Sequence, residues 1–446
     1  MIAGADSLKL MLETVLLYAL GILVVLVGLA LSIGLHELGH LLPAKRFGVK
    51  VTKYMIGFGP TLWSRRKGET EYGFKLLPLG GYISMAGMYP PSRDGDAPRD
   101  SSTSFFDAAV QEGGADEDDE RGFYRLPVWK RIVVMLGGPF ANLVLAVVCA
   151  TIVLCGFGLP QPSTTIASVS ECVLPVTSDR EECAPGDPAA PAAAAGIRPG
   201  DRIVSVDGVA ISSWDESSDV IRAHPEEPIP FVVERDGEQL ELTVTPLLLE
   251  RYEFDEDGAP VLGPDGEPVV AEVGVVGIGP GYENVRQSIL AVPVSMGERI
   301  AAAAGVIASF PQRIYDIGHA WITGEERDPN GPLSVVGVGR LAGEITSFEE
   351  VPVEYRIASL VDVLGALNLA LFLFNLIPLL PLDGGHIAGA LWEALRRGVA
   401  RLARRPDPGP VDISRWAPVT MVVAVLLGAV GVFLIAADIF KPITLL

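Results

Sequence analysis

The distribution of apolar residues divides the chain into four long uncharged runs separated by polar segments. The runs cover residues 14–35, 132–158, 363–382 and 417–437. The 22 residues of the first run would form a helix about 33 Å long, which matches the hydrocarbon core of a bilayer. A soluble protein can bury one such helix in its core, but four of them with polar loops between are typical of a membrane protein. We therefore predict four transmembrane helices.

The polar segment after the first run alternates like a pair of short strands. Residues 51–62 and 71–87 form the expected strands, and Arg65-Arg66-Lys67-Gly68 forms the turn between them. Gly80-Gly81 lies in the second strand and would allow another backbone to approach closely. We expect a β-loop that is apolar enough to dip into the membrane.

Three further segments have patterns of their own. Residues 90–120 are rich in Pro, Ser, Asp and Gly, and we expect them to form a disordered acidic insert. Residues 164–250 alternate as short strands around Gly-Asp pairs, which predicts a folded domain. Residues 283–322 have the spacing of an amphipathic helix that would lie near the membrane.

Charge is distributed unevenly over the 446 residues and their formal net charge of −21. Residues 42–131 contain 14 Lys and Arg, and the short segment 384–416 contains six Arg. Residues 160–282, in contrast, contain 24 Asp and Glu but only six Arg. The positive-inside rule then predicts that the two basic segments are cytoplasmic, and that the acidic segment and both termini lie outside. The negative charge belongs mainly to one external domain, so nucleic acid is not an expected partner.

Two short motifs carry the candidate chemistry. His36-Glu37-Leu38-Gly39-His40 follows the first run, and an HExxH spacing puts two imidazoles on one face of a helix, where they can hold one zinc. A catalytic zinc needs a third protein ligand and an open position. Asp383, in Leu382-Asp383-Gly384-Gly385, is the favoured third ligand, because the first and third helices run in the same direction and end at the same membrane face. Asp362 would lie at the opposite face. We expect Glu37 to act as the general base.

The remaining histidines and the cysteines are assigned to other roles. We expect His224 and His319 to be external surface residues, and His386 to face the cytoplasm or to lie behind the metal ligands. Cys149 and Cys155 fall in the second run and are expected to pack there. Cys172 and Cys183 fall in the external segment, where oxidation is permitted, so a disulfide between them is predicted.

Several motifs resemble known families. The stretch AAAAGIRPGDRIVSVDGVAISSW (192–214) resembles the core of PDZ domains, although a clear GLGF-type carboxylate-binding loop is missing. HExxH in a first span, GGPFAN entering a second, an external PDZ-like domain and NLIPLLPLDGGH (375–386) together resemble the site-2 protease family. The similarity is greatest to the bacterial branch that cuts membrane-anchored anti-sigma factors, and the single PDZ-like domain is similar to that of actinobacterial members.

This resemblance implies a site and a reaction. It implies that His36, His40 and Asp383 bind Zn²⁺, that Glu37 is the catalytic base, and that Asn375 binds the substrate carbonyl. We also expect the scissile segment to bind as an added strand along the β-loop, near Gly80, Gly81 and Tyr82. The expected substrate is a single-pass transmembrane protein that an upstream site-1 protease has already trimmed. The expected location is the bacterial inner membrane, and the alternatives are a catalytically silent PDZ scaffold or a transporter with a structural metal.

The predicted fold is a polytopic α-helical membrane protein with an inserted extracytoplasmic PDZ-like α+β domain and a cytoplasmic membrane-associated β-loop. The predicted boundaries are residues 1–44 (first helix), 45–89 (β-loop), 90–126 (acidic insert), 127–159 (second helix), 160–282 (PDZ-like domain), 283–358 (amphipathic helix and juxtamembrane segment), 359–384 (third helix), 385–416 (basic cytoplasmic loop) and 417–440 (fourth helix).

Overall fold

The protein was analysed as a computed structural model. The structure describes residues 2–89, 99–102, 121–176, 178, 180, 183–253, 261–263, 268–329, 331–348, 351–411 and 416–443. The chain divides into two compact units, one formed by Met1–Phe157 with Ser288–Leu446 and the other by Gly158–Gln287. Each unit has its own hydrophobic core.

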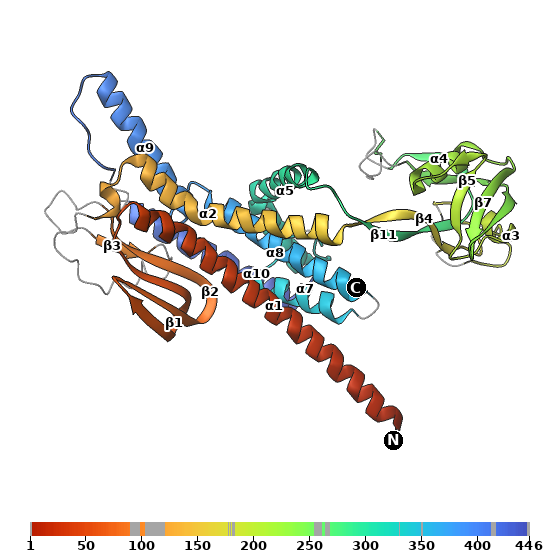
Figure 1. The fold of residues 1–446 in the computed structure, drawn as a ribbon, viewed down its shortest axis with the longest axis horizontal. Coiled ribbons are helices and arrows are strands. Elements are labelled where there is room, and N and C mark those ends of the chain that lie inside the picture. Colours follow the sequence, from red (N-terminus) through yellow and green to blue (C-terminus); the bar gives the residue numbers. More distant parts are fainter. Residues whose placement is uncertain are drawn as a thin grey trace. The chain divides into compact units, whose positions relative to one another are not determined.

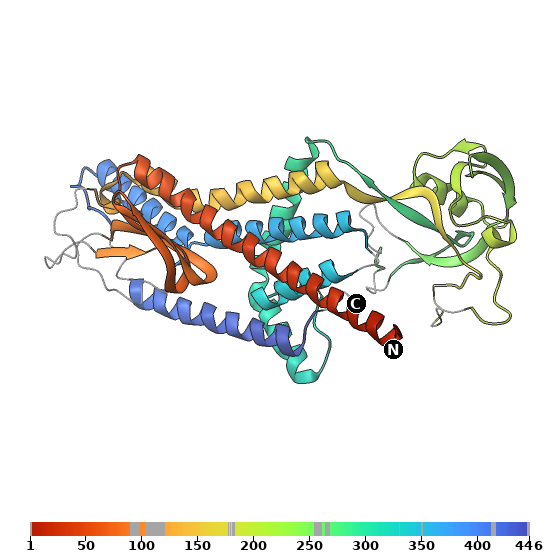
Figure 2. The same cartoon turned by 60° about the horizontal axis from the view of Figure 1, so that its bottom comes forward.

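Long helices dominate the first unit. Helices α1 (Ile2–Arg46) and α8 (Val353–Asn375) run in the same direction, and α2 (Val128–Thr151) and α10 (Ala417–Phe440) run the opposite way (Figures 1 and 2). Helix α2 packs against both α1 and α8, and it continues into a π-helical turn at Ile152–Phe157. A further helix, α7 (Val335–Ser347), packs against α1. The shared direction of α1 and α8 brings their C-terminal ends to one end of the unit.

Five helices in the described part of the chain are long and apolar enough to cross a membrane, whereas we expected four. The additional candidate is α5 (Ala291–Ala308), which falls in the segment that we assigned to an amphipathic helix near the membrane. Figure 2 shows α5 running across the long helices rather than along them. It is followed by α6 (Phe310–Thr323), which packs through Ile317 against Leu434 of α10.

The third predicted helix and the basic loop after it differ from expectation. We expected one helix over 359–384, but α8 ends at Asn375 and a separate helix, α9 (Asp383–Leu402), begins at Asp383. Pro378 and Pro381 lie between them, and proline cannot continue a helix because it has no amide hydrogen to donate. Most of the expected loop 385–416 is therefore helical, and Asp383 opens a helix instead of closing one.

A small sheet packs on the C-terminal end of α1. It consists of β1 (Val51–Lys67), β2 (Thr70–Tyr89) and β3 (Arg99–Ser102), and β1 and β2 pair with several register shifts, so that Ile56 lies opposite both Gly81 and Phe74. Its inner face shares a core with α1 and α2. Most of the acidic insert predicted at 90–126 lies outside the described residues. The described part of that range contains β3 and a 3-10 turn at Phe123–Arg125.

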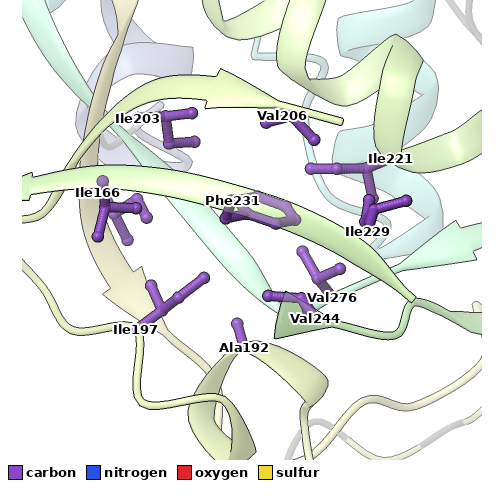
Figure 3. Close-up of a cluster of buried hydrophobic side chains, with 11 residues drawn as sticks. Ile166, Ala192, Ile197, Ile203, Val206, Ile221, Ile229, Phe231, Val244 and Val276 are labelled. Carbon is purple, nitrogen blue, oxygen red and sulfur yellow. The ribbon is translucent and has the colours of Figure 1, made fainter. Parts of the chain in front are cut away.

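The second unit is built on a six-stranded sheet with the order β11-β4-β5-β7-β8, in which β6 pairs with β5. Phe231 is fully buried at its centre, where aliphatic side chains from strands and from α4 surround it (Figure 3). A separate hairpin is formed by β9 and β10. The elements are β4 (Leu159–Val169), α3 (Pro191–Ala194), β5 (Arg202–Val206), β6 (Val209–Ala210), α4 (Trp214–Ala223), β7 (Ile229–Arg235), β8 (Glu238–Val244), β9 (Leu247–Tyr252), β10 (Val270–Val275) and β11 (Ile278–Val285).

A disulfide and a buried ion pair stabilise the second unit. Cys172 and Cys183 form a disulfide, while Cys149 and Cys155 are free thiols in the helical unit. Asp201 is 1% exposed, and its carboxylate accepts hydrogen bonds from Arg235 at 2.7 and 2.8 Å and from the Arg198 amide at 2.8 Å. A bidentate pair of this kind holds the loop before β5 against the end of β7.

Candidate metal centre

Two imidazoles and one carboxylate converge where α1 meets the start of α9. His36 and His40 lie one turn apart on α1, and their Nε2 atoms are 3.2 Å from each other. Each Nε2 atom is 3.3 Å from Oδ2 of Asp383. The three ligand atoms all lie within 4.8 Å of one another. Residues 343 positions apart in the sequence thus offer three metal-binding atoms to one point.

Neighbouring groups on α2 orient both rings. His40 is fully buried, and its Nδ1–H donates to the carbonyl oxygen of Val134 at 2.8 Å. The amide of Asn142, also fully buried, lies 3.1 Å from Nδ1 of His36. A histidine that binds metal through Nε2 carries its proton on Nδ1, and a half turn of the Asn142 amide lets Oδ1 accept a hydrogen bond from this Nδ1–H. Both rings are therefore held with Nε2 directed at Asp383.

Two features of the site suit a metal ion: the chemistry of its three donor atoms, and a buried carboxylate oxygen that lacks a hydrogen bond. Asp383 is 6% exposed, and its Oδ2 makes no hydrogen bond of normal geometry with any described residue. A buried carboxylate oxygen without a hydrogen bond is costly unless a cation satisfies it. Two imidazoles and a carboxylate are a donor set of catalytic zinc sites, which keep a further position open.

Glycines allow α1 and α2 to approach until their backbones touch beside the site. A Cβ atom on Gly39 would lie 2.1 Å from the carbonyl oxygen of Gly137, and one on Gly137 would lie 2.0 Å from that of Gly39. A Cβ atom on Gly138 would lie 2.2 Å from Nε2 of His40 and 2.8 Å from Cε1 of His36. The Gly-Gly-Pro segment of the GGPFAN motif therefore forms one wall of the metal centre.

Glu37 lies between the metal ligands and the sheet. Glu37 is 5% exposed. A Cβ atom on Gly81 of β2 would lie 3.0 Å from Cγ of Glu37. Tyr54 of β1 donates a hydrogen bond to the Gly34 carbonyl at 2.7 Å. Burial and the negative charge of Glu37 raise the pKa of Tyr54 to about 12, so its hydroxyl remains protonated at neutral pH. The sheet thus reaches the carboxylate that follows the first metal ligand.

The structure separates the expected site residues into those near the triad and those elsewhere. Gly81 approaches Glu37, and Gly80 beside it has φ +146° and packs on Phe58. Tyr82 is buried, with Nζ of Lys75 4.9 Å from its ring centre. Asn375 is the last residue of α8 and, within the described chain, makes no hydrogen bond to the triad.

Two of the residues that we set aside as ligands pair with other groups. Asp362 forms an ion pair with Arg299 of α5 at 2.7 Å, and His319 lies 3.4 Å from Glu325. His224 belongs to the second unit, and His386 lies one turn beyond Asp383 on α9.

Sequence reasoning missed Asn142. It is the only amide in the uncharged run 132–158, and a polar side chain in such a run usually faces other helices or a functional site. That signal could have identified it as a candidate.

Comparison with known proteins gives consistent matches over most of the chain. The model of peptidase family M50 matches residues 24–404. Zinc metalloprotease Rip1 of Mycobacterium tuberculosis is 34% identical over 96% of this chain and 100% of that protein. Zinc metalloprotease Rip1 of Mycolicibacterium smegmatis is 32% identical over 96% of this chain and 100% of that protein. Metalloprotease MmpA of Caulobacter vibrioides is 30% identical over 85% of this chain and 88% of that protein.

Proposed function

This chain belongs to peptidase family M50, the site-2 proteases, and we propose that it cuts a peptide bond within the transmembrane segment of a single-pass membrane protein. It is a zinc metalloendopeptidase of the site-2 type and an integral membrane protein, as the sequence motifs predicted. The observation that carries the proposal is the convergence of His36, His40 and Asp383 on one point at the end of a helix long and apolar enough to span a bilayer.

The residues around this point have distinct roles in the proposed reaction. His36, His40 and Asp383 hold Zn²⁺, which when bound acts as a Lewis acid and lowers the pKa of water towards 7. Glu37 accepts a proton from the attacking water and then delivers it to the leaving amine. Val134 and Asn142 keep the two imidazoles in the tautomer that leaves Nε2 available. Asn375 donates to the oxygen of the substrate carbonyl.

We propose that the substrate is unwound before it is cut, and that it binds as a strand along β2 near Gly80–Tyr82, ahead of the stretch from Ser84 that pairs with β3. A transmembrane helix hides its carbonyl groups in internal hydrogen bonds, and unwound backbone in a membrane needs new partners. The approach of Gly81 to Glu37 supports this binding mode, because it brings β2 beside the general base. Replacing Gly81 or Tyr82 with Pro should slow cleavage without removing zinc, and substrates with Gly or Pro near the scissile bond should be cut faster than Leu-rich ones. Unchanged rates in both comparisons would contradict the binding mode.

We propose that the second unit is a PDZ-like domain outside the cytoplasm, which admits only substrates that a site-1 protease has trimmed, such as an anti-sigma factor. Its sheet, α4 and acidic composition support a folded filter. Leu159 pairs with Val285, so the unit begins and ends at adjacent strands and can be removed as one piece. A variant that lacks residues 158–287 should cut untrimmed substrate. If that deletion still requires prior trimming, the unit is not the filter.

We propose an orientation in the bacterial inner membrane from the loop charges. The sheet, α9 and the metal centre belong to the end of the helices that carries Lys45, Arg46, Lys130 and the arginines of α9. The positive-inside rule assigns this end to the cytoplasm and both termini to the outside.

Substitution of single carboxylates tests the ligand set. Asp383→Asn should lose most of its zinc after dialysis against a chelator, measured as metal per chain, and should lose cleavage as well. Asp362→Asn is the matched control, because Asp362 is the other carboxylate of the same hydrophobic segment and pairs with Arg299. Equal zinc content in Asp383→Asn and the wild type would remove Asp383 from the ligand set.

A further inference from the structure

Helix α9 exposes an apolar stripe that no described residue covers. Five large side chains recur at helical spacing along one face of α9 and are all more than half exposed: Leu391, Trp392, Leu395, Val399 and Leu402, with exposed fractions of 55, 55, 56, 58 and 88%. The five span about 100° of the helix circumference at 100° per residue. A continuous exposed stripe of this size on a helix needs an apolar environment.

Arginines flank this stripe and extend beyond its end. Arg396 and Arg401 lie on either side of it on α9, and Arg404 and Arg405 follow the last turn. Arg401, Arg404 and Arg405 form no ion pair with any residue that the structure describes. A helix with an apolar face bordered by cationic side chains binds at the interface of an anionic bilayer, where the long side chains reach the headgroups.

The opposite face of α9 is fixed to the helical unit. Glu393 is fully buried, and its carboxylate lies 2.6 Å from Nη2 of Arg131 on α2. The amide of Val411 donates to the other oxygen of Glu393 at 3.1 Å. Ala390 is also buried, so one side of α9 is packed and the other side, with the stripe, points away.

The chain itself keeps α9 close to a membrane surface. The preceding membrane-spanning candidate ends at Asn375, seven residues before Leu382, and the next begins at Pro418, 16 residues after Leu402. We propose that α9 binds the anionic surface of the leaflet at the metal-site end of the protein, with its apolar stripe among the acyl chains and its arginines among the headgroup phosphates.

This contact has a consequence for the metal centre that rests on the proposed function. Asp383 is the first residue of α9 and is buried at the triad. A helix held on its outer face by lipid and on its inner face by Arg131 has little freedom to carry Asp383 away from His36 and His40. Zinc should therefore leave the protein more slowly in anionic membranes than in neutral ones.

The depth of Trp392 tests the proposal without any activity measurement. The full-length protein and Trp392→Phe are reconstituted in phosphatidylcholine vesicles with or without phosphatidylglycerol, with acyl chains brominated or plain. The difference between the two proteins isolates the emission of Trp392 from that of the other five tryptophans. We expect brominated lipid to quench this emission, and to quench it more strongly when phosphatidylglycerol is present.

A matched pair of substitutions completes the design. Leu395→Asp introduces a charge into the stripe and should abolish the quenching of Trp392. Ala394→Asp introduces the same charge at an exposed neighbouring position on a different face of α9 and should leave the quenching unchanged.

The opposite results would overturn the proposal. Absence of quenching in every vesicle would mean that α9 stands in water or docks on a protein, and quenching that ignores phosphatidylglycerol would remove the role of the arginines. Zinc release into a chelator, followed in the same vesicles, tests the link to Asp383. If Trp392 is quenched as expected but zinc is released at equal rates in both lipids, only the link between lipid binding and Asp383 is overturned. The zinc content of the wild type before release tests the proposed function separately.

Discussion

Replacing Gly138 with alanine should remove zinc without altering any metal ligand. The added methyl carbon would lie 2.2 Å from Nε2 of His40 and 2.6 Å from its Cε1, whereas ordinary contacts begin near 3.4 Å. His40 must therefore move by about 1 Å or the helices must separate. His40 cannot turn aside easily, because it is fully buried and its Nδ1 is bonded to Val134. Separation of α1 and α2 would in turn disrupt the backbone contact between Gly39 and Gly137.

The size of the effect follows from how little error a zinc site tolerates. Ligand distances in zinc sites are held to within about 0.2 Å, so a shift of about 1 Å takes His40 out of the coordination sphere. Loss of one of three ligands should lower zinc affinity at least about 100-fold, and displacement of a reacting group by about 1 Å costs a similar factor in rate. We expect Gly138→Ala to retain its fold and to lose both zinc and cleavage.

The assay measures zinc per chain after dialysis against a chelator, together with cleavage of a membrane-embedded substrate. Gly428→Ala is the control, because Gly428 also lies in a membrane-spanning candidate helix and an added Cβ there has no neighbour within 4 Å. The control should keep wild-type zinc and rate. If Gly138→Ala keeps both as well, α2 does not form the wall of the metal centre and the packing argument is wrong.

Two further changes test other parts of the structure. Asn142→Ala should weaken zinc binding about 10- to 100-fold by releasing His36, seen as a shift in a competition titration, and unchanged affinity would mean that Asn142 does not hold the ring. The hydrogen bonds from Arg235 hold the pKa of Asp201 below its ordinary value, so the stability that they provide is present above that value and is lost as the pH falls through the lowered one. Asp201→Asn should therefore destabilise a 158–287 fragment by about 2 kcal/mol at pH 7 and flatten its loss of stability in acid, measured by urea unfolding; a wild-type acid profile in that variant would assign the acid sensitivity elsewhere.

The metal ligands were predictable because their signals are local. HExxH fixes the spacing of His36 and His40 within one helix, and Asp383 could be chosen over Asp362 because helices that run in one direction end at one face. The residues that orient or confine the ligands were not predictable in this way. Asn142 and Gly138 act through the contact between α1 and α2, and a sequence does not state which faces of two helices meet.

The secondary-structure errors have a similar cause. The arginines after Asp383 predicted a basic loop, and this charge signal concealed the apolar spacing of Leu391, Leu395 and Val399, which is helical. Helix α5 satisfies the length and hydropathy of a span, yet it lies across the long helices, and that direction is set by its packing and not by its composition.

In the proposed reaction, Glu37 transfers the proton and is not a zinc ligand. The most direct test is to measure zinc content and cleavage on one preparation of Glu37→Gln in lipid. We predict wild-type zinc per chain and no cleavage, because the amide keeps the shape of the side chain but cannot accept the proton from water. Cleavage by Glu37→Gln at the wild-type rate, with zinc bound, would contradict the account.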